Sequence, residues 1–400
     1  MQDISPRQPE ALLGRSRFAG GAAIFVLFMG STVLTPIYSF YREVYGLGPL
    51  QLTLIYSVYV IGNLLALLFL GRLSDAIGRR PVVLAGLGLA ALSSALFMAA
   101  PAVSWLFAAR IVNGLAVGVG SGAATAWITE SLPAERRTLG ASVMTAFNFA
   151  GLAAGPVCAG LLVQFAPWPL RLPFAVYLAL ILAVAVAAMT APETGEGSGS
   201  FSLKPQLGVP KHLRLLFTAP AAAGFAAMSE VGYYAALGPA AIRQALKIEN
   251  HALNGLMVAE LFFAAMLTIL ATHGVSPRKA LLAGLLATPM GLGSLLAAQQ
   301  WASLPVMLAA TAVTGAASAL GYRGGLGVIN ELAPPDRRAG MASAYFVCCF
   351  LGNALPIIGV GALSQTFGLD WASRIFALTL SVIALAAFAV ALRLKRQTPQ

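Results

Sequence analysis

The chain has 400 residues, of which 58% are hydrophobic and only 10% are charged, and its formal net charge is +11. Soluble domains carry about 25% charged residues, so these few charges could not cover a water-soluble globule of this length. The basic residues stand in short clusters between apolar runs and form no continuous basic face, which argues against a nucleic-acid partner. The composition therefore predicts a protein whose flanks face a lipid bilayer.

Apolar runs recur along the whole chain. A helix needs about 20 apolar residues to cross the hydrocarbon of a bilayer. Such runs predict spans near residues 18–41, 50–71, 81–100, 104–130, 138–165, 169–191, 214–238, 251–272, 278–298, 303–331, 338–366 and 370–394. The first run is too long for the apolar core of a signal peptide, so we expect an uncleaved first span. The predicted fold class is an all-α membrane protein with twelve transmembrane helices in two six-helix bundles.

The lysines and arginines lie mostly on one side of the predicted spans. That side holds 18 of the 25: Arg7, Arg15, Arg17, Arg72, Arg79, Arg80, Arg136, Arg137, Lys204, Lys211, Arg214, Arg278, Lys279, Arg337, Arg338, Arg393, Lys395 and Arg396. The opposite loops hold Arg42, Arg171, Arg243, Lys247 and Arg374. The positive-inside rule then places both termini in the cytoplasm and the protein in the cytoplasmic (inner) membrane.

A linker rich in glycine, serine and proline occupies residues 192–213, at the midpoint of the chain. It divides the sequence into a predicted N-terminal six-helix bundle, residues 1–191, and a predicted C-terminal bundle, residues 214–400. We expect the linker itself to be cytoplasmic.

The two halves repeat. A shift of 201 residues aligns 108–165 with 309–366 and matches Gly114 with Gly315, Gly120 with Gly321, Glu130 with Glu331, Pro133 with Pro334, Arg136 with Arg337, Arg137 with Arg338, Ser142 with Ser343, Gly151 with Gly352 and Gly160 with Gly361. Shared apolar composition does not align a glutamate, a proline and an arginine pair in one loop. Parallel repeats of six spans are typical of transporters whose halves rock about a central cleft.

The loop between the second and third predicted spans carries a spaced motif. It reads Gly71, Arg72, Leu73, Ser74, Asp75, Ala76, Ile77, Gly78, Arg79 and Arg80. This pattern closely resembles the signature loop of the major facilitator superfamily, and a degenerate copy lies around 274–279. The resemblance implies alternating access, in which this loop acts as a latch between the halves while the protein faces outward, with Glu130 as a partner of the basic residues.

The residue types of this loop also suit that role. Asp75 beside Arg79 and Arg80 can form hydrogen-bonded ion pairs. The aspartate could also accept from backbone amides at the start of the eleventh span, around 339–342, where the helix dipole favours an anion. The alternative is a loop whose arginines only set the orientation of the spans.

Two further motifs resemble the same family. Arg110 and Gly114 in the fourth span resemble its arginine motif, with Asn113 where a glutamine is frequent. In the fifth span, Gly151, Gly155, Pro156 and Gly160 resemble the glycine-proline motif of the drug:proton antiporter branch, although Ala159 replaces one glycine. The resemblance implies export. The alternative for these glycines is ordinary packing of small residues.

Four ionisable residues lie inside predicted spans: Arg110, Glu230, Glu260 and Arg323. Charges within a bilayer are costly, so each is a candidate for proton coupling or substrate binding. Glu230 and Glu260 are expected at one depth on successive helices, where two carboxylates could share or exchange a proton. The alternatives are a structural anchor for Arg110, an interhelical or snorkelling contact for Arg323, and carboxylates that do not face the cavity. The first span lacks the acidic residue that many such exporters carry.

Aromatic and polar side chains could line the cavity: Tyr38, Asn63, Asn113, Asn148, Tyr233 and Tyr234. Pro36, Pro239 and Pro356 could break or kink helices. The cysteines and histidines show no metal-ligand spacing, so we expect no metal and no cofactor other than a coupling proton.

The leading hypothesis is a monomeric, proton-coupled exporter of small lipophilic or cationic compounds. The alternatives are a symporter or facilitator for a small metabolite such as a sugar or organic acid, and a membrane sensor that does not transport. An enzyme is not expected, because no nucleophile elbow, zinc motif or phosphate-binding loop occurs. Without an ATP-binding segment, active transport has to draw on an ion gradient.

Overall fold

The computed structural model describes residues 10–133, 137–195, 197, 203, 205 and 207–394, and the structural statements below concern these residues. Their regular structure is helical. In chain order the helices are α1 (Glu10–Thr32), η1 (Thr35–Ile37), α2 (Tyr38–Tyr45), α3 (Pro49–Ser57), α4 (Tyr59–Leu65), η2 (Ala66–Leu70), α5 (Leu73–Ile77), α6 (Arg79–Ala99), α7 (Val103–Glu130), α8 (Arg137–Phe165), α9 (Leu172–Thr190), η4 (Lys211–Leu213), α10 (Arg214–Ala236), α11 (Gly238–Leu246), α12 (His251–Ala271), α13 (Pro277–Trp301), α14 (Leu304–Leu332) and α15 (Arg338–Leu394).

Eleven helical segments of the described chain are long and apolar enough to cross a membrane. The last of them, α15, has 57 residues and contains both the eleventh and the twelfth predicted span. Between these two spans Gly368 adopts φ 80° and ψ 163°, a backbone conformation that only glycine adopts without strain. The predicted all-α fold of twelve spans is confirmed, with the last two spans joined through one residue.

Prolines mark two of the helix boundaries that the apolar pattern alone did not resolve. Pro36 lies in η1, so the first predicted span consists of α1 and α2 with a short link between them. Pro239 lies in the first turn of α11, directly after α10 ends at Ala236. Pro356, by contrast, lies inside α15, and the helix continues through it.

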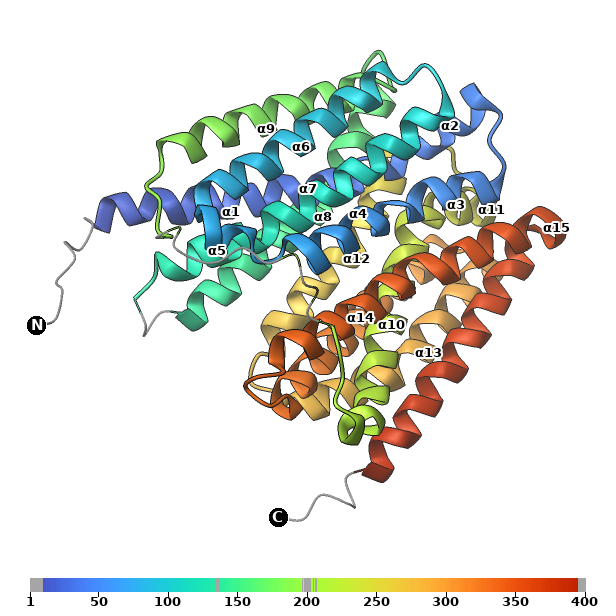
Figure 1. Ribbon diagram of the computed structural model, residues 1–400. Helices are drawn as coiled ribbons and strands as arrows, with labels where there is room; N and C mark the ends of the chain where they lie inside the picture. The colour runs from blue at the N-terminus through green and yellow to red at the C-terminus, as the bar shows by residue number, and fades with distance from the viewer. Residues whose placement is uncertain are drawn as a thin grey trace, which may run out of the picture.

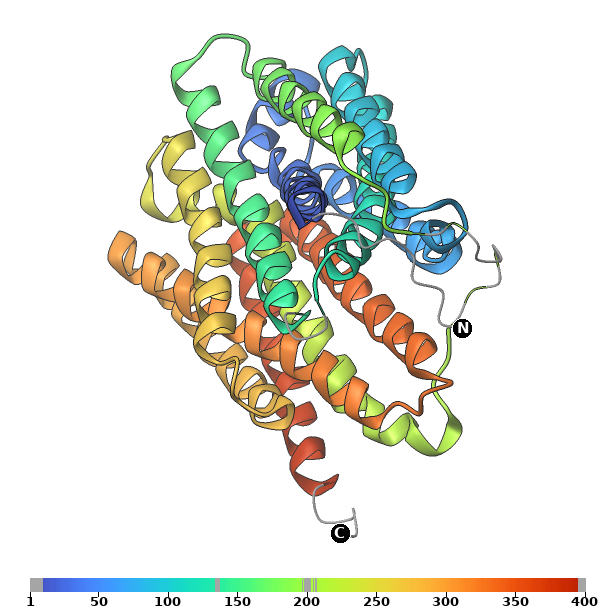
Figure 2. The same ribbon diagram turned by 90° about the vertical axis from the view of Figure 1, so that its left-hand side faces the viewer.

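Two bundles are visible in Figures 1 and 2, one formed by the elements up to α9 and the other by α10–α15. In the N-terminal half α6 packs against α7 and α9, and α1 packs against α7, α8 and α9. In the C-terminal half α13 packs against α14, and α10 packs against α14 and α15. The first described turn of α1 and the last described turn of α15 lie at the same end of the molecule (Figure 1).

The repeat recurs in how glycines pack. A side chain at Gly151 would meet the backbone of Phe25, and a side chain at Gly352 would meet the backbone of Phe225. Gly151 and Gly352 are repeat partners, so α8 touches α1 in the first half as α15 touches α10 in the second. Such close backbone approach is possible only for a residue without a side chain.

The halves meet along α8 with α12 and along α3 with α15. Tyr56 donates from its hydroxyl to Oδ1 of Asn353 at 2.9 Å, and the backbone N–H of His251 donates to Oε1 of Gln164 at 2.8 Å. These contacts lie toward the end of the molecule that carries α2, α3 and α11, which we call the opposite end. The bundles diverge toward the end that carries α5, which we call the basic end after Arg72, Arg79 and Arg80 beside that helix (Figure 1).

Candidate functional site

The signature loop forms the short helix α5 and a turn into α6 at the basic end. Gly78 has φ 98°, so this position requires glycine, whereas Gly71 has φ −58° and does not. Leu73 begins α5, and Asp75 in its first turn points to Arg79, with which it forms an ion pair. The predicted pairing of Asp75 with Arg79 is therefore present.

Arg79 is the centre of a polar network. Its guanidinium also donates to Glu130 at the end of α7, with Nη2 2.7 Å from Oε1, and to Oγ of Ser74 at 2.8 Å. The Arg79 side chain is 14% exposed and that of Asp75 is 53% exposed. The guanidinium of Arg80 pairs with neither Asp75 nor Glu130 among the described contacts and donates to the carbonyl oxygen of Ala191.

Glu193 is part of the same network, and the sequence analysis missed it. Its Oε1 and Oε2 each accept a backbone N–H at the start of α6, from Arg79 and Arg80, both at 2.9 Å. The carboxylate therefore caps α6 at its positive end. Thr194 extends the connection by donating from its hydroxyl to Glu130 at 2.9 Å. The start of the linker is thus fastened to the signature loop.

The predicted contact between Asp75 and the start of the eleventh span is not made in this conformation. The described interaction of the Asp75 side chain is with Arg79, within the N-terminal half. Near the start of α15, the carbonyl of Gly340 accepts from the backbone N–H of Gly208 in the linker. The bundles are apart at the basic end, so a latch that requires closure at this end would be released here. Arg136 and Arg137, the arginine pair of the repeat alignment, have side chains outside the part that the structure describes.

Arg110 is buried in the N-terminal half, with 1% of its surface exposed. Its guanidinium donates to the carbonyl oxygens of Ser31 on α1 and Tyr56 on α3, both at 3.1 Å. It also lies 4.8 Å from the ring centroid of Tyr59 and 5.5 Å from that of Tyr56. These contacts stabilise the cation without an acidic partner.

Glu230 on α10 is fully buried in the C-terminal half, with 0% of its surface exposed. Neither carboxylate oxygen has a hydrogen-bond partner. The hydroxyl of Thr288 on α13 lies close enough to the carboxylate to interact with it. The side chain therefore faces the interior of its own bundle.

Glu260 lies on a different face of the bundle and does not interact with Glu230. It is partly exposed and shares its side of α12 with Leu256, Phe263 and Leu267, which are each about half exposed. Residues on the far side of α12 contact the other helices, as Gly255 does against the backbone of α8. The predicted pair of carboxylates sharing a proton is therefore wrong for this structure, because equal depth does not give equal orientation.

Arg323 does not line the interior either. Its guanidinium donates to the hydroxyl of Thr272 at 3.2 Å and to the carbonyl oxygens of His273 and Val275 at 2.9 and 3.1 Å. These acceptors belong to the connection between α12 and α13 at the basic end. Arg323 thus makes an interhelical contact in this structure, the kind of contact that the sequence left open beside substrate binding.

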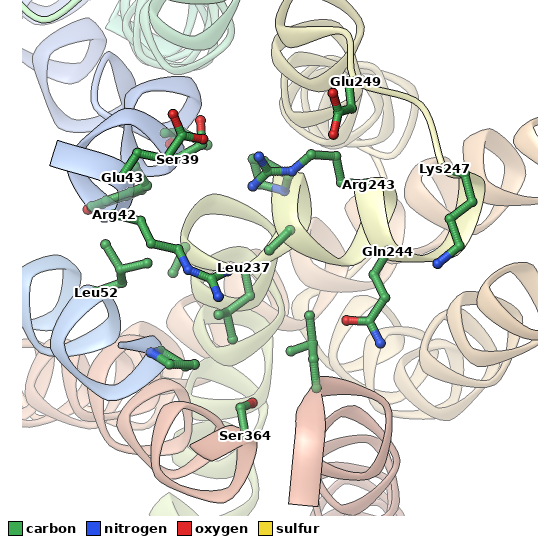
Figure 3. A pocket seen from close by; sticks show the side chains of 17 residues that line it. Ser39, Arg42, Glu43, Leu52, Leu237, Arg243, Gln244, Lys247, Glu249 and Ser364 are labelled. Atoms are coloured by element: carbon green, nitrogen blue, oxygen red, sulfur yellow. The ribbon is translucent and has the colours of Figure 1, made fainter. Parts of the chain in front are cut away.

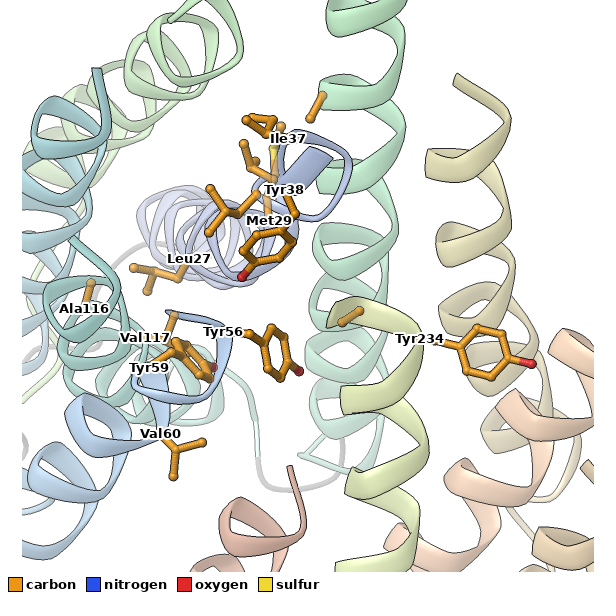
Figure 4. Packing of buried hydrophobic residues seen from close by; sticks show 14 of the residues in the cluster. Leu27, Met29, Ile37, Tyr38, Tyr56, Tyr59, Val60, Ala116, Val117 and Tyr234 are labelled. Carbon is orange, nitrogen blue, oxygen red and sulfur yellow. The ribbon is translucent and has the colours of Figure 1, made fainter. Parts of the chain in front are cut away.

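Most of the predicted cavity residues face neighbouring helices within their own half. Tyr233 is 1% exposed, and its hydroxyl lies 2.6 Å from Oγ of Ser373. Tyr234 is 2% exposed and points away from the N-terminal half (Figure 4). Asn63 and Asn113 are also buried, whereas Asn148 is partly exposed. Tyr38 lies beside Tyr56 and Tyr59 in the cluster of Figure 4.

The glycine-proline segment of α8 lies between two helices that belong to different halves. A side chain at Gly155 would meet Met29 and Thr32 of α1, and one at Gly160 would meet the carbonyl oxygen of His251 on α12 at 2.6 Å. The carbonyl of Pro156 in turn lies against Gly255 of α12. This segment therefore forms a smooth helix face of small residues, and the face lies at the junction of the halves.

A cavity of about 840 Å³ opens at the opposite end, between α2 and α3 of one half and α11 of the other. Tyr38 and Ser39 line it together with charged residues of both halves (Figure 3). Arg42 and Arg243 point into the space from opposite sides. Among the described ion pairs none involves these two arginines. Among the residues that the structure describes, no group of three or more His, Cys, Asp or Glu side chains could hold a metal ion.

The comparisons with known proteins agree with this architecture. Among curated proteins, the chain is 27% identical over 189 residues to the quinolone resistance protein NorA of Staphylococcus aureus, covering 46% of this chain and 47% of that protein. It is 32% identical over 124 residues to the arabinose-proton symporter of Bacillus subtilis, covering 31% of this chain and 27% of that protein. The matches thus span less than half the length of these relatives.

Solved structures match over nearly the whole chain. A bacterial homologue of the human lysosomal transporter Spinster, in an inward-facing and occupied conformation, has a TM-score of 0.76 at 15% identity and covers 96% of each chain. The nucleoside transporter NupG has a TM-score of 0.73 at 14% identity, covering 94% of this chain and 99% of that one. The sequence profile described as Major Facilitator Superfamily matches residues 21–273, more than half of the chain. The protein therefore belongs to the major facilitator superfamily and is a multi-pass membrane protein.

Proposed function

We propose that this transporter exports small lipophilic or cationic compounds in exchange for protons, with Glu230 as the group that binds and releases the coupling proton. The observation that carries the proposal is the carboxylate of Glu230, which is fully buried and has no hydrogen-bond partner. A bare carboxylate in such surroundings is strongly disfavoured, so binding of a proton changes its free energy more than that of any exposed carboxylate.

The direction of transport is proposed from α8. Its glycine face contacts both α1 and α12, so this helix is placed to transmit movement between the halves. The resemblance of this segment to the antiporter motif and the similarity to the NorA resistance protein favour export of the kind of compound that such proteins remove. The proposed orientation keeps the basic end in the cytoplasm of a cell with an inner membrane.

The second candidate is proton-driven uptake of a sugar or another small metabolite. The similarity to the arabinose-proton symporter, at 32% identity over 124 residues, favours it. A buried carboxylate would serve a symporter equally well, so the coupling group does not separate the two candidates. The direction and the chemistry of the substrate do.

Inverted membrane vesicles separate the candidates. With an imposed proton gradient, we expect accumulation of a lipophilic cationic dye such as ethidium, and loss of that accumulation when an ionophore collapses the gradient. Glu230→Gln should reduce the flux to that of vesicles without the protein. Glu260→Gln is the matched control and should retain it, because this carboxylate is partly exposed on another face. Dye flux that ignores the gradient, or counterflow of arabinose without dye flux, would contradict proton-coupled export.

A further inference from the structure

Three helices of the C-terminal half each bring a pair of residues to one place. Glu230 and Tyr234 are four residues apart on α10, Thr288 and Gly291 three apart on α13, and Thr311 and Thr314 three apart on α14. Residues at these spacings lie on one helix face. We call Glu230, Tyr234, Thr288, Thr311 and Thr314 the Glu230 pocket.

Contacts between the helices show that these faces meet. Thr288 approaches the carboxylate of Glu230, and Thr311 and Thr314 approach the hydroxyl of Tyr234. A side chain at Gly291 would come within 2.8 Å of Oγ1 of Thr314, so α13 and α14 pack closely here. Glu230 also lies near enough to Tyr234 for the two to interact electrostatically.

The residues of the Glu230 pocket are buried. The exposed fractions are 0% for Glu230, Thr311 and Thr314, 2% for Tyr234 and 3% for Thr288. Buried polar atoms in folded proteins nearly always have partners. Here both carboxylate oxygens of Glu230 and the hydroxyl of Tyr234 have none.

The pocket has an excess of acceptor oxygens. Thr311 already donates its hydroxyl hydrogen to the carbonyl of Met307, and Thr314 donates its own to the carbonyl of Ala310. Their oxygens are left with lone pairs, and only Tyr234 and Thr288 have a hydroxyl hydrogen to give. Two carboxylate oxygens and several hydroxyl oxygens therefore lie in one buried cluster with few hydroxyl hydrogens to share, which favours a cation among them.

No side chain of the described chain supplies that charge. No lysine, arginine, histidine or second carboxylate on the helices packed against α10 interacts with Glu230, and Tyr234 is its titratable neighbour. Arg323, which the sequence placed in the same bundle, donates to the connection between α12 and α13 instead. In the repeat, Thr311 and Thr314 occupy the positions of Arg110 and Asn113, so the first half has a built-in cation where the second has hydroxyls.

We propose that the Glu230 pocket is a Na⁺ site inside the C-terminal half, where Na⁺ and H⁺ compete for the same carboxylate. Oxygen ligands select hard cations. A single carboxylate balances one positive charge, so a divalent ion would leave an uncompensated charge in a buried pocket. This inference deepens the proposed function because it concerns the same residue, but it is tested by binding and does not depend on export.

Binding of ²²Na⁺ to the purified full-length protein tests the site, with choline replacing Na⁺ at constant ionic strength. We expect saturable binding at alkaline pH and weaker binding at mildly acidic pH, because protons occupy the carboxylate. Glu230→Gln should abolish binding. Thr288→Val and Thr314→Val keep the carboxylate and should each weaken Na⁺ affinity about tenfold, the effect of losing one charge-assisted oxygen contact.

The matched control is Glu260→Gln, which should bind Na⁺ as the unsubstituted protein does. Size-exclusion chromatography shows whether each variant is folded, and the two threonine variants keep the test valid if Glu230→Gln is not. Absence of saturable Na⁺ binding in the folded protein, or full binding in Thr288→Val and Thr314→Val, would overturn the Na⁺ site while leaving proton-driven export standing. Na⁺ binding without proton-driven dye flux would support the site and contradict the proposed function.

Discussion

In the N-terminal half the buried charge is Arg110 on α7, and in the C-terminal half it is Glu230 on α10. The guanidinium of Arg110 donates to two carbonyl oxygens and lies over two aromatic rings, and only its Nε lacks an acceptor, whereas both carboxylate oxygens of Glu230 lack a hydrogen-bond partner and have Thr288 nearby. Both residues are almost completely buried. This contrast supports the proposals above, in which Glu230 exchanges a cation and Arg110 does not.

This comparison gives the two halves different roles in the proposed cycle. Arg110 joins α1, α3 and α7, so it stabilises the packing of the N-terminal half. Glu230 changes its free energy when it gains or loses a cation, and it lies among α10, α13 and α14. Loading of the pocket could therefore alter how these three helices pack, at a place separate from the contacts between the halves.

The largest effect should come from Arg110→Met, which removes the buried charge that has hydrogen-bond acceptors. The carbonyls of Ser31 and Tyr56 would lose their donor inside the bundle. We expect a loss of about 3 kcal/mol in the free energy of unfolding. Thermal unfolding of the purified protein in detergent measures it. An unchanged melting temperature would show that Arg110 is not a structural anchor.

Glu230→Met should act in the opposite direction. It removes an uncompensated carboxyl group from apolar surroundings and replaces it with a side chain of similar length. We expect the free energy of unfolding in Na⁺-free buffer to stay the same or to rise by about 1 kcal/mol, while coupled transport is lost. The same thermal assay applies. A destabilisation as large as that of Arg110→Met would mean that the carboxyl group has a structural partner.

Glu193→Ala removes a carboxylate that accepts backbone N–H groups at the start of α6. The start of α6 would lose the carboxylate that accepts from Arg79 and Arg80. Loss of such a cap costs about 1 kcal/mol. Glu193→Gln retains one acceptor oxygen, so its melting temperature should lie between those of Glu193→Ala and the unsubstituted protein. Equal melting temperatures for all three would contradict the capping role.

Glu260→Gln should have the smallest effect, within about 0.5 kcal/mol of the unsubstituted protein. This carboxylate is partly exposed and has no described charged partner. Stability and dye flux should both remain. Loss of proton-driven flux in this variant would move the coupling site from α10 to α12 and reverse the comparison with Glu230.

The sequence predicted those features that depend on composition and on local spacing. Apolar length gave the spans, the shifted alignment gave the repeat, and four-residue spacing placed Asp75 beside Arg79. The direction in which a side chain points from its helix could not be predicted in the same way. Residue counting placed Glu230 and Glu260 at one expected depth, but which side of each helix meets a neighbour depends on packing between helices.

Glu193 was missed for a related reason. It lies more than a hundred residues from Arg79 along the chain, and nothing in the linker composition shows that it folds back onto α6. The Glu230 pocket could have been recognised in part, because Thr311 and Thr314 stand at helical spacing where the first half has Arg110 and Asn113. That substitution of hydroxyls for a cation was visible in the repeat alignment.

The one-residue turn at Gly368 has a consequence for how the protein is made. A side chain there would meet nothing within 4 Å, so the position selects glycine for its backbone and not for lack of space. The segments before and after it have no polar loop between them. We therefore expect the two spans to enter the bilayer together as a helical hairpin, and a tag or protease site inserted at this turn to disturb that step.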